Sequence, residues 1–368
     1  MRPAPEVEAS ESAPLRPEID LKPVEIDGVR VPIRERTLTA KPFGNLIHFE
    51  RDGCIGKPRA LIVAPLAGMR SVILYDMIMA MLPDHDVHLQ CWLDAADVPL
   101  KYGPFNLDDN IAYVIGALHY LGSGVHLIGL CQSALSTLAT AAILASDGDR
   151  AQPATLTLMG GKLDTRIHPT RIDRLALGWP MDWFERYLMT IAPASRAGRG
   201  RHIYPAGVEW MMLSLHLFRH FTSGGDLLGK MLHDDGADPM GHPFPRLFFS
   251  LMNVPAEFFL DTMVRVFREP ALPRSQLVWR GTPVAPAAIN GTALLTIEGE
   301  NDDISGLGQT HVAHDLCTGI PAERQAHFQC PKVGHFGLFH GEAWRNLVLP
   351  RIRSFILAAG NHSSQPDS

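Results

Sequence analysis

The sequence feature that most constrains the fold is an alternation of short, continuously apolar segments with longer segments of helical periodicity. The apolar segments lie at residues 60–64, 87–92, 125–130 and 154–159. Short apolar runs of this length predict strands that are buried on both faces. Because such strands alternate with helices, the sequence predicts a mostly parallel sheet with right-handed crossovers and helices on both faces.

The regular alternation divides the chain into parts. Residues 166–276 are dense in Met, Phe, Trp, His and Leu with helical spacing, which predicts a helical cap inserted into the α/β domain. The α/β pattern then resumes with predicted strands at 293–297 and 324–329 and a closing helical stretch at 342–358. The predicted organisation is a disordered segment at 1–26, a first core part at 27–165, a helical cap at 166–276, a second core part at 277–359 and a disordered tail at 360–368.

Composition excludes several classes of protein. The 368 residues are 46% hydrophobic and 20% charged, so the chain can bury a large core. A formal net charge of −6 argues against binding to a nucleic-acid backbone. Five scattered cysteines do not form a disulfide framework and indicate a reducing compartment. The polar amino terminus does not resemble a secretory signal, and the apolar stretch 126–145 divides into a strand and a helix, so we expect a cytoplasmic protein without a transmembrane segment.

A cysteine stands at the most chemically informative strand-to-helix junction. The segment Gly129-Leu-Cys131-Gln-Ser133 has the form of a nucleophile elbow, with Cys in place of Ser and small residues two positions away on each side. The helix that begins here directs its positive end at the sulfur, which favours the reactive thiolate. The Gln132 N–H is the expected first oxyanion donor. The alternative interpretation is a small buried cysteine beside a tight turn.

Two further residues follow Cys131 in the order that this kind of site requires. Asp302 and Asp303 come after the predicted strand 293–297, and His335 follows the predicted strand 324–329 between two glycines. Nucleophile, acid and base occur in this chain order in enzymes with a nucleophile elbow. Taken singly, the aspartates could be turn residues and His335 an ordinary loop histidine. Together the three positions predict a Cys131, Asp302, His335 triad.

The predicted triad has a defined chemistry. His335 would take the Cys131 proton, Asp302 would orient the imidazole and stabilise its charge, and the thiolate would attack an ester carbonyl to give an acyl-thioester. The second oxyanion donor is expected in the loop after the first parallel strand, where we favour the Ala67 N–H. We find no Cys-x-x-Cys or His-Glu-x-x-His spacing, so no metal site and no bound cofactor are predicted.

The chain resembles the intracellular polyhydroxyalkanoate (polyhydroxybutyrate) depolymerases of the α/β-hydrolase superfamily. The resemblance rests on segments spread over most of the sequence, among them LIGLCQSALSTLA, MGGKLDTRIHPTRI, PAEFFLDTMVRVF and VGHFGLFHGEAWRNLVLPRIRSFI. It implies that Cys131 is the nucleophile, His335 the base and Asp302 the acid, with Asp303 as the alternative. The chain departs from the family at Ala67-Gly68-Met69, where members tend to have Ser-Gly-His, and at Ser133, where they tend to have proline.

The resemblance also implies a substrate and a location. The enzyme would act on a stored 3-hydroxyalkanoate polyester at a granule surface, by hydrolysis or, with coenzyme A as acyl-accepting co-substrate, by thiolysis. An apolar cap would suit an insoluble substrate. Two alternatives stay open: an esterase or acyltransferase for small hydroxyacid oligomers, and a catalytically inactive granule-associated protein. A homo-oligomer is also left open.

Overall fold

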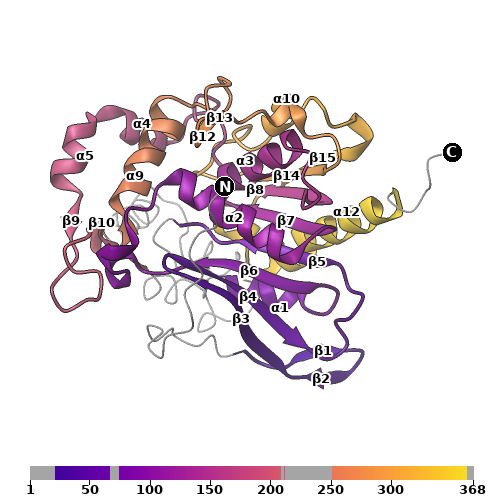
Figure 1. Cartoon of the computed structure of the whole chain (residues 1–368). Coiled ribbons are helices and arrows are strands. Elements are labelled where there is room, and N and C mark those ends of the chain that lie inside the picture. The colour runs from indigo at the N-terminus through magenta and orange to yellow at the C-terminus, as the bar shows by residue number, and fades with distance from the viewer. Residues whose placement is uncertain (1–20, 67–73, 209–210, 212–250, 363–368) are drawn as a thin grey trace.

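A central eight-stranded sheet organises the computed structural model, which describes residues 21–66, 74–208, 211 and 251–362 (Figure 1). The strand order is β15-β14-β8-β7-β5-β6-β4-β3. The first six strands in this order pair in parallel, whereas β4 pairs antiparallel with β6 and β3 pairs antiparallel with β4. Their bounds are β3 Ile33–Lys41, β4 Gly44–Arg51, β5 Arg59–Val63, β6 Asp86–Trp92, β7 Val125–Leu130, β8 Thr155–Met159, β14 Ala293–Gly299 and β15 Gln325–Cys330.

Helices cover both faces of this sheet, and the strand order explains their placement. The chain moves from β5 to β6 in one direction and from β6 through β7 to β8 in the other, so right-handed crossovers put the first helix on one face and the next two on the opposite face. The last helix lies beside the first one, and Arg353 of the last helix donates to the Ala80 carbonyl of the first. The helices are α1 Tyr75–Met81, α2 Leu107–Leu121, α3 Ser133–Ser146, α10 Ala313–Leu316, α11 Gly341–Ala343 and α12 Leu349–His362.

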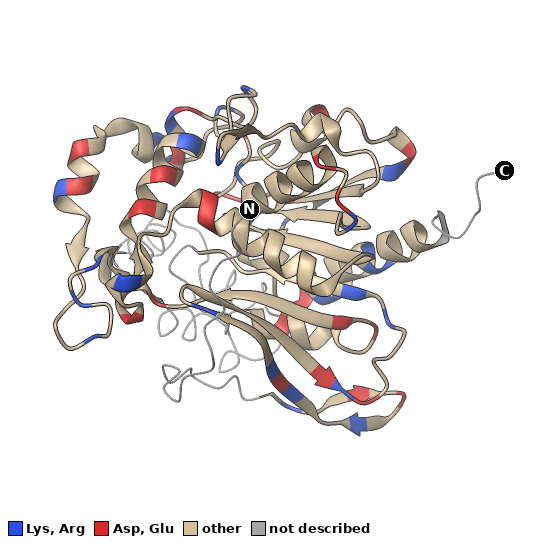
Figure 2. Ribbon diagram, viewed as in Figure 1, with Lys and Arg blue, Asp and Glu red and all other residues tan. Residues whose placement is uncertain are grey.

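The centre of the sheet is apolar because it is buried on both faces. Every residue of β7 and β8 is buried. Neither strand contains Lys, Arg, Asp or Glu, and both are uniformly tan in Figure 2, where charged residues lie mainly on helices, loops and outer strands. The six predicted central strands are confirmed to within two residues at each end. The mostly parallel sheet predicted from the apolar runs is therefore the observed one.

Both terminal segments that the sequence predicts as disordered include residues that are ordered in the structure. The segment predicted as disordered to residue 26 contains β1 Val24–Ile26, which pairs with β2 Val29–Val31. The connecting Asp27 and Gly28 both have positive φ, 50° and 79°, as an Asp-Gly hairpin turn requires. At the other end α12 extends through His362, beyond the predicted start of the tail at 360. Residues 1–20 and 363–368 lie outside the described part of the chain.

The insertion at 166–276 is not purely helical. Its described parts contain α4 Arg171–Gly178, α5 Met181–Tyr187, α9 Ala256–Thr262 and the π-helical η4 Met263–Arg268. They also contain a small antiparallel sheet of β9 Thr190–Ile191, β10 His202–Tyr204 and β11 Val254–Pro255. Strands of two or three residues are too short to give a period-2 signal, so the prediction of a helical cap was wrong here. Residues 209–210 and 212–250 of the predicted cap lie outside the description.

A buried arginine joins the insertion to the core. Arg201 is 2% exposed and donates to the carbonyls of Val98, Pro99 and Gly103 at 2.9, 2.8 and 2.7 Å. Its guanidinium also lies 4.9 Å from the centre of the Phe43 ring. Burial lowers the Arg201 pKa, yet the three carbonyls compensate the charge by hydrogen bonds.

We expect Arg201→Ala to lower the free energy of unfolding by about 3 kcal/mol, because three carbonyls lose charged donors and a cavity forms where the buried side chain was. Urea unfolding followed by tryptophan fluorescence measures the change. The exposed Arg199 lies two residues away and provides the matched control, Arg199→Ala. Equal stability of the two variants would contradict an anchoring role for Arg201.

Candidate active site

Cys131 lies at the sharp turn between β7 and α3. Its φ is 51°, a left-handed conformation that residues with side chains rarely adopt. The Cys131 N–H donates to the Met159 carbonyl at 2.8 Å, and the Cys131 carbonyl accepts from the Ala134 N–H at 3.2 Å. The half-buried sulfur-bearing residue is thus fixed at the carboxyl edge of the sheet, as a nucleophile elbow requires.

Small residues allow strand and helix to pass this closely. A Cβ atom on Gly129 would lie 2.6 Å from the Thr137 hydroxyl oxygen on α3. A Cβ atom on Gly161, which follows β8, would clash with the Cβ of Ala134. Gly129 was predicted from the elbow pattern, whereas Gly161 is contributed by the neighbouring strand and has no spacing relative to Cys131 that reveals it.

Ser133 does more than replace a glycine. Its hydroxyl is buried and accepts from the Leu130 N–H at 2.8 Å. The same hydroxyl lies 2.7 Å from the Val63 carbonyl and 2.9 Å from the Leu130 carbonyl, to either of which it can donate. The elbow is therefore bonded to the end of β5, the strand that leads into the predicted oxyanion loop. The elbow pattern predicts only that residue 133 is small, and this bonding depends on the neighbouring strand β5.

The structure brings the three predicted catalytic residues together. His335 Nδ1 lies 2.7 Å from Asp302 Oδ2, and His335 also hydrogen-bonds Cys131. Both members of the His335–Asp302 pair are almost fully buried, with 3% and 1% of their side chains exposed. Because His335 Nδ1 hydrogen-bonds Asp302, Nε2 is the ring nitrogen that can bond the Cys131 sulfur.

The geometry distinguishes Asp302 from its neighbour. The second carboxylate oxygen of Asp302 accepts from the N–H groups of Ile304 and Ser305 at 2.9 and 2.7 Å. Asp303 is exposed. Both oxygens of Asp302 are thus held, one by His335 and one by backbone, so the carboxylate has a fixed direction toward the imidazole.

The charges at this site favour a protonated histidine. Burial by itself lowers the pKa of His335, but the charges and hydrogen bonds of Asp302 and Cys131 outweigh it and raise that pKa to about 10. At neutral pH the ring is therefore an imidazolium between two acidic groups.

Gly160, which the elbow pattern does not include, leaves room for the His335 ring. Gly160 follows β8 and has a positive φ of 54°. A Cβ atom there would lie 3.2 Å from Cε1 and 3.3 Å from Nδ1 of His335. The only sequence signal is the Gly-Gly doublet directly after a predicted strand, which indicates a close approach of some other group.

The predicted oxyanion donors have different outcomes. Gln132 is the N-cap of α3, where backbone N–H groups have no carbonyl partner within the helix. Its N–H can therefore serve an oxyanion beside Cys131. Ala67, the predicted second donor, lies outside the described residues, which end at Leu66 on this side of the gap.

The other four cysteines have different surroundings. Cys91, Cys317 and Cys330 are buried. Burial raises the pKa of Cys317 to about 12 and of Cys330 to about 11, so these two thiols stay protonated at neutral pH. Cys54 is half-buried in a turn after β4. None of the four lies directly before the N-cap of a helix, as Cys131 does before α3. Among the described helices, none is long and apolar enough to cross a membrane.

Solved structures with similar folds include a bacterial membrane phospholipase A, with 13% identity, a TM-score of 0.52 and coverage of 89% of this chain and 87% of that one. A 2-hydroxy-6-oxo-6-phenylhexa-2,4-dienoate hydrolase from Rhodococcus sp. strain RHA1 gives 12% identity, a TM-score of 0.50 and coverage of 89% and 99%. The α/β hydrolase GrgF from Penicillium sp. sh18 gives 13% identity and a TM-score of 0.50, with coverage of 89% of this chain and 99% of that one. At these identities the likeness shows the α/β-hydrolase fold.

Sequence comparison identifies the family. No curated protein matches the chain significantly. A family profile described as PHB de-polymerase C-terminus matches residues 160–360, more than half of the chain. The matched part contains Gly160 and Gly161 beside the elbow, together with Asp302 and His335. The chain belongs to this PHB de-polymerase family of α/β-hydrolases and is an ester hydrolase.

Proposed function

We propose that the protein is an intracellular poly-3-hydroxybutyrate depolymerase that cleaves polyester ester bonds with Cys131, His335 and Asp302. The observation that carries the proposal is the buried hydrogen-bonded chain from Asp302 through His335 to a cysteine in a strained elbow. Positive-φ strain at a reactive side chain is typical of a site that presents a nucleophile.

The first half-reaction transfers the acyl group to sulfur. The Cys131 thiolate attacks the ester carbonyl carbon, and the carbonyl electron pair moves to oxygen, where the Gln132 N–H stabilises it. When the intermediate collapses, the carbon–oxygen bond to the alcohol breaks. The His335 imidazolium donates its proton to the departing alkoxide, which leaves a neutral imidazole held by Asp302 and an acyl-thioester on Cys131.

The second half-reaction resolves the thioester. The neutral His335 takes a proton from water or from the thiol of coenzyme A, and the resulting nucleophile attacks the acyl carbon. The sulfur leaves as thiolate, which restores the thiolate–imidazolium pair. Water yields a free hydroxyacid end, whereas coenzyme A yields a hydroxyacyl thioester. We propose no bound cofactor for either route.

The described part of the insertion supports action at an insoluble surface. Leu177, Trp179 and Tyr187 are 51%, 47% and 63% exposed on or beside α4 and α5. Trp179 stacks on Trp183 at 4.7 Å between ring centroids. Exposed apolar side chains grouped in one segment mark surfaces that contact other apolar matter. We therefore propose that this segment contacts the storage granule in the cytoplasm.

Cys131→Ala is expected to lower turnover of amorphous polyhydroxybutyrate granules on the order of 10⁴-fold or more, because no other group supplies the attacking thiolate. Released 3-hydroxybutyrate and its coenzyme A thioester are quantified by mass spectrometry, with and without coenzyme A. Cys54→Ala is the matched control and should keep full activity. Granule binding without release by the wild type would sink the depolymerase proposal and favour an inactive granule-associated protein or an oligomer substrate.

The pH dependence reports on His335. Since the pKa of His335 is raised to about 10, kcat/KM on a soluble hydroxybutyrate oligomer should fall as the pH rises through about 10, where the proton for the leaving alkoxide is lost. In Asp302→Asn the alkaline limb should move to lower pH, because the charge that raises the pKa is gone. Identical alkaline limbs in both enzymes would argue against the relay.

The granule contact is tested separately from the chemistry. Trp179→Ala and Tyr187→Ala together should reduce turnover of granules roughly tenfold through lost apolar contact area, while turnover of a soluble oligomer stays unchanged. Granule co-sedimentation measures binding directly. Tyr120 on α2 is similarly exposed, at 52%, so Tyr120→Ala is the control. Equal losses on both substrates would mean that the aromatic residues support the fold instead.

A further inference from the structure

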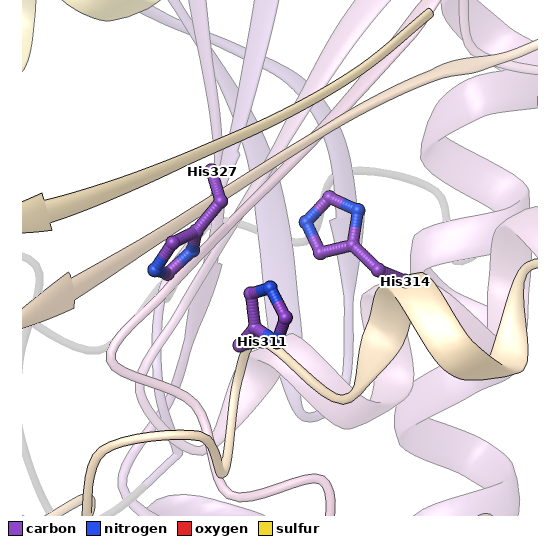
Figure 3. Close-up of side chains that lie close together, drawn as sticks. All are labelled: His311, His314 and His327. Carbon is purple, nitrogen blue, oxygen red and sulfur yellow. The ribbon is translucent and has the colours of Figure 1, made fainter. Parts of the chain in front are cut away.

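Three histidines that take no part in the proposed mechanism gather beside β14 and β15. His311 and His314 are three residues apart at the start of α10, and His327 lies on the edge strand β15. Figure 3 shows the three rings turned toward a common space. One ring nitrogen from each lies within 4.8 Å of the others.

Gln325 determines which nitrogen of the His314 ring carries the proton. Gln325 Nε2 donates to the Ile320 carbonyl at 2.7 Å, so its Oε1 is the atom that lies 2.6 Å from His314 Nδ1. An amide oxygen only accepts, so His314 Nδ1 carries the proton and the neutral ring has its lone pair on Nε2. Histidines that bind metal ions hold the second ring nitrogen in this way, by donating to a carbonyl or carboxylate.

A buried threonine lies between this ring and the next. Thr296 Oγ1 lies 2.7 Å from His314 Nε2 and 2.8 Å from His327 Nδ1. The hydroxyl donates to the His314 lone pair and accepts from the His327 Nδ1–H. An ion bound by His314 Nε2 and His327 Nδ1 replaces both hydrogen bonds to the Thr296 hydroxyl, and the proton of His327 then lies on Nε2 of the same exposed ring.

A buried negative charge lies beneath the cluster. Glu298 is 4% exposed and accepts from the backbone N–H groups of Gly308, Thr310 and His311 at 2.9, 2.7 and 3.0 Å. These donors are neutral, so they orient the carboxylate and leave its charge uncancelled. The charge of Glu298 acts on both His314 and His327. It favours a cation at the cluster.

We propose that His311, His314 and His327 bind one divalent transition-metal ion of the zinc class. Imidazole nitrogen is a preferred ligand of Zn²⁺, and three imidazoles leave a fourth position for water. A tetrahedral zinc ion with bonds of about 2.1 Å places its ligands about 3.4 Å apart. Rotation of the exposed His311 and His327 side chains brings the nitrogens from within 4.8 Å to that spacing.

The ion joins two elements of the fold. It links β15, the edge strand, to the segment that begins at Asp302 and ends in α10. That segment is also bonded to the elbow side, because Thr310 and Ser305 donate to the Gly161 carbonyl at 2.8 and 3.0 Å. Metal binding at the cluster therefore stabilises the folded chain independently of the function of Cys131.

The test is metal binding by the full chain after chelator treatment. Calorimetric titration with Zn²⁺ should give one equivalent for the wild type, and His311→Ala and His327→Ala should each weaken binding at least about tenfold. Zn²⁺ should also raise the thermal midpoint of the wild type and not of these variants. His119→Ala removes an exposed histidine on α2 and should bind as the wild type does.

Titration with Co²⁺ separates this site from thiol sites. Three imidazoles and water give visible ligand-field absorption without a thiolate-to-metal charge-transfer band. Such a band would indicate binding at Cys131 or at the group formed by His48, Cys54 and Asp86. A thiolate band, unchanged affinity in both histidine variants, or no uptake by the wild type would each overturn the proposal.

Discussion

The structure of the site depends on one backbone conformation, the positive φ of Cys131. An L-residue adopts it only where the surroundings enforce it. Here the enforcement comes from bonds to two neighbouring strands: the Cys131 N–H donates to Met159 at the end of β8, and the Ser133 hydroxyl bonds to Val63 at the end of β5. The strain is therefore supported by the buried centre of the sheet, and the sulfur is presented at its carboxyl edge.

The same sheet explains why a catalytic group can be assembled from distant parts of the chain. Parallel strands end at one edge, so the loops after β7, β14 and β15 meet there although they are separated by up to two hundred residues. Burial then makes the electrostatics strong. Asp302 and His335 are nearly inaccessible, and the carboxylate keeps the imidazole charged against the cost of burial.

Three regions of the described chain differ in the kinds of side chain that they bring together. The elbow, Asp302 and His335 lie at the carboxyl edge of the sheet. The insertion that follows β8 carries the exposed aromatic residues Trp179 and Tyr187. The histidine cluster lies along β14 and β15, beside a buried glutamate that takes no part in the triad. Sequence spacing did not indicate the histidine cluster, because His314 and His327 become neighbours through strand pairing and a short helix.

The sequence by itself determined the central strands, the elbow and the strand ends at which Cys131, Asp302 and His335 stand, because each rests on a local pattern of apolar residues, glycines and turns. It also contained the Asp27-Gly28 turn that closes the first hairpin. Only the tertiary structure decided between Asp302 and Asp303, placed Gly160 against His335 and gave Ser133 its partner on β5. Those outcomes depend on which strands are neighbours, and a chain's local pattern does not record the packing of residues that are distant in sequence.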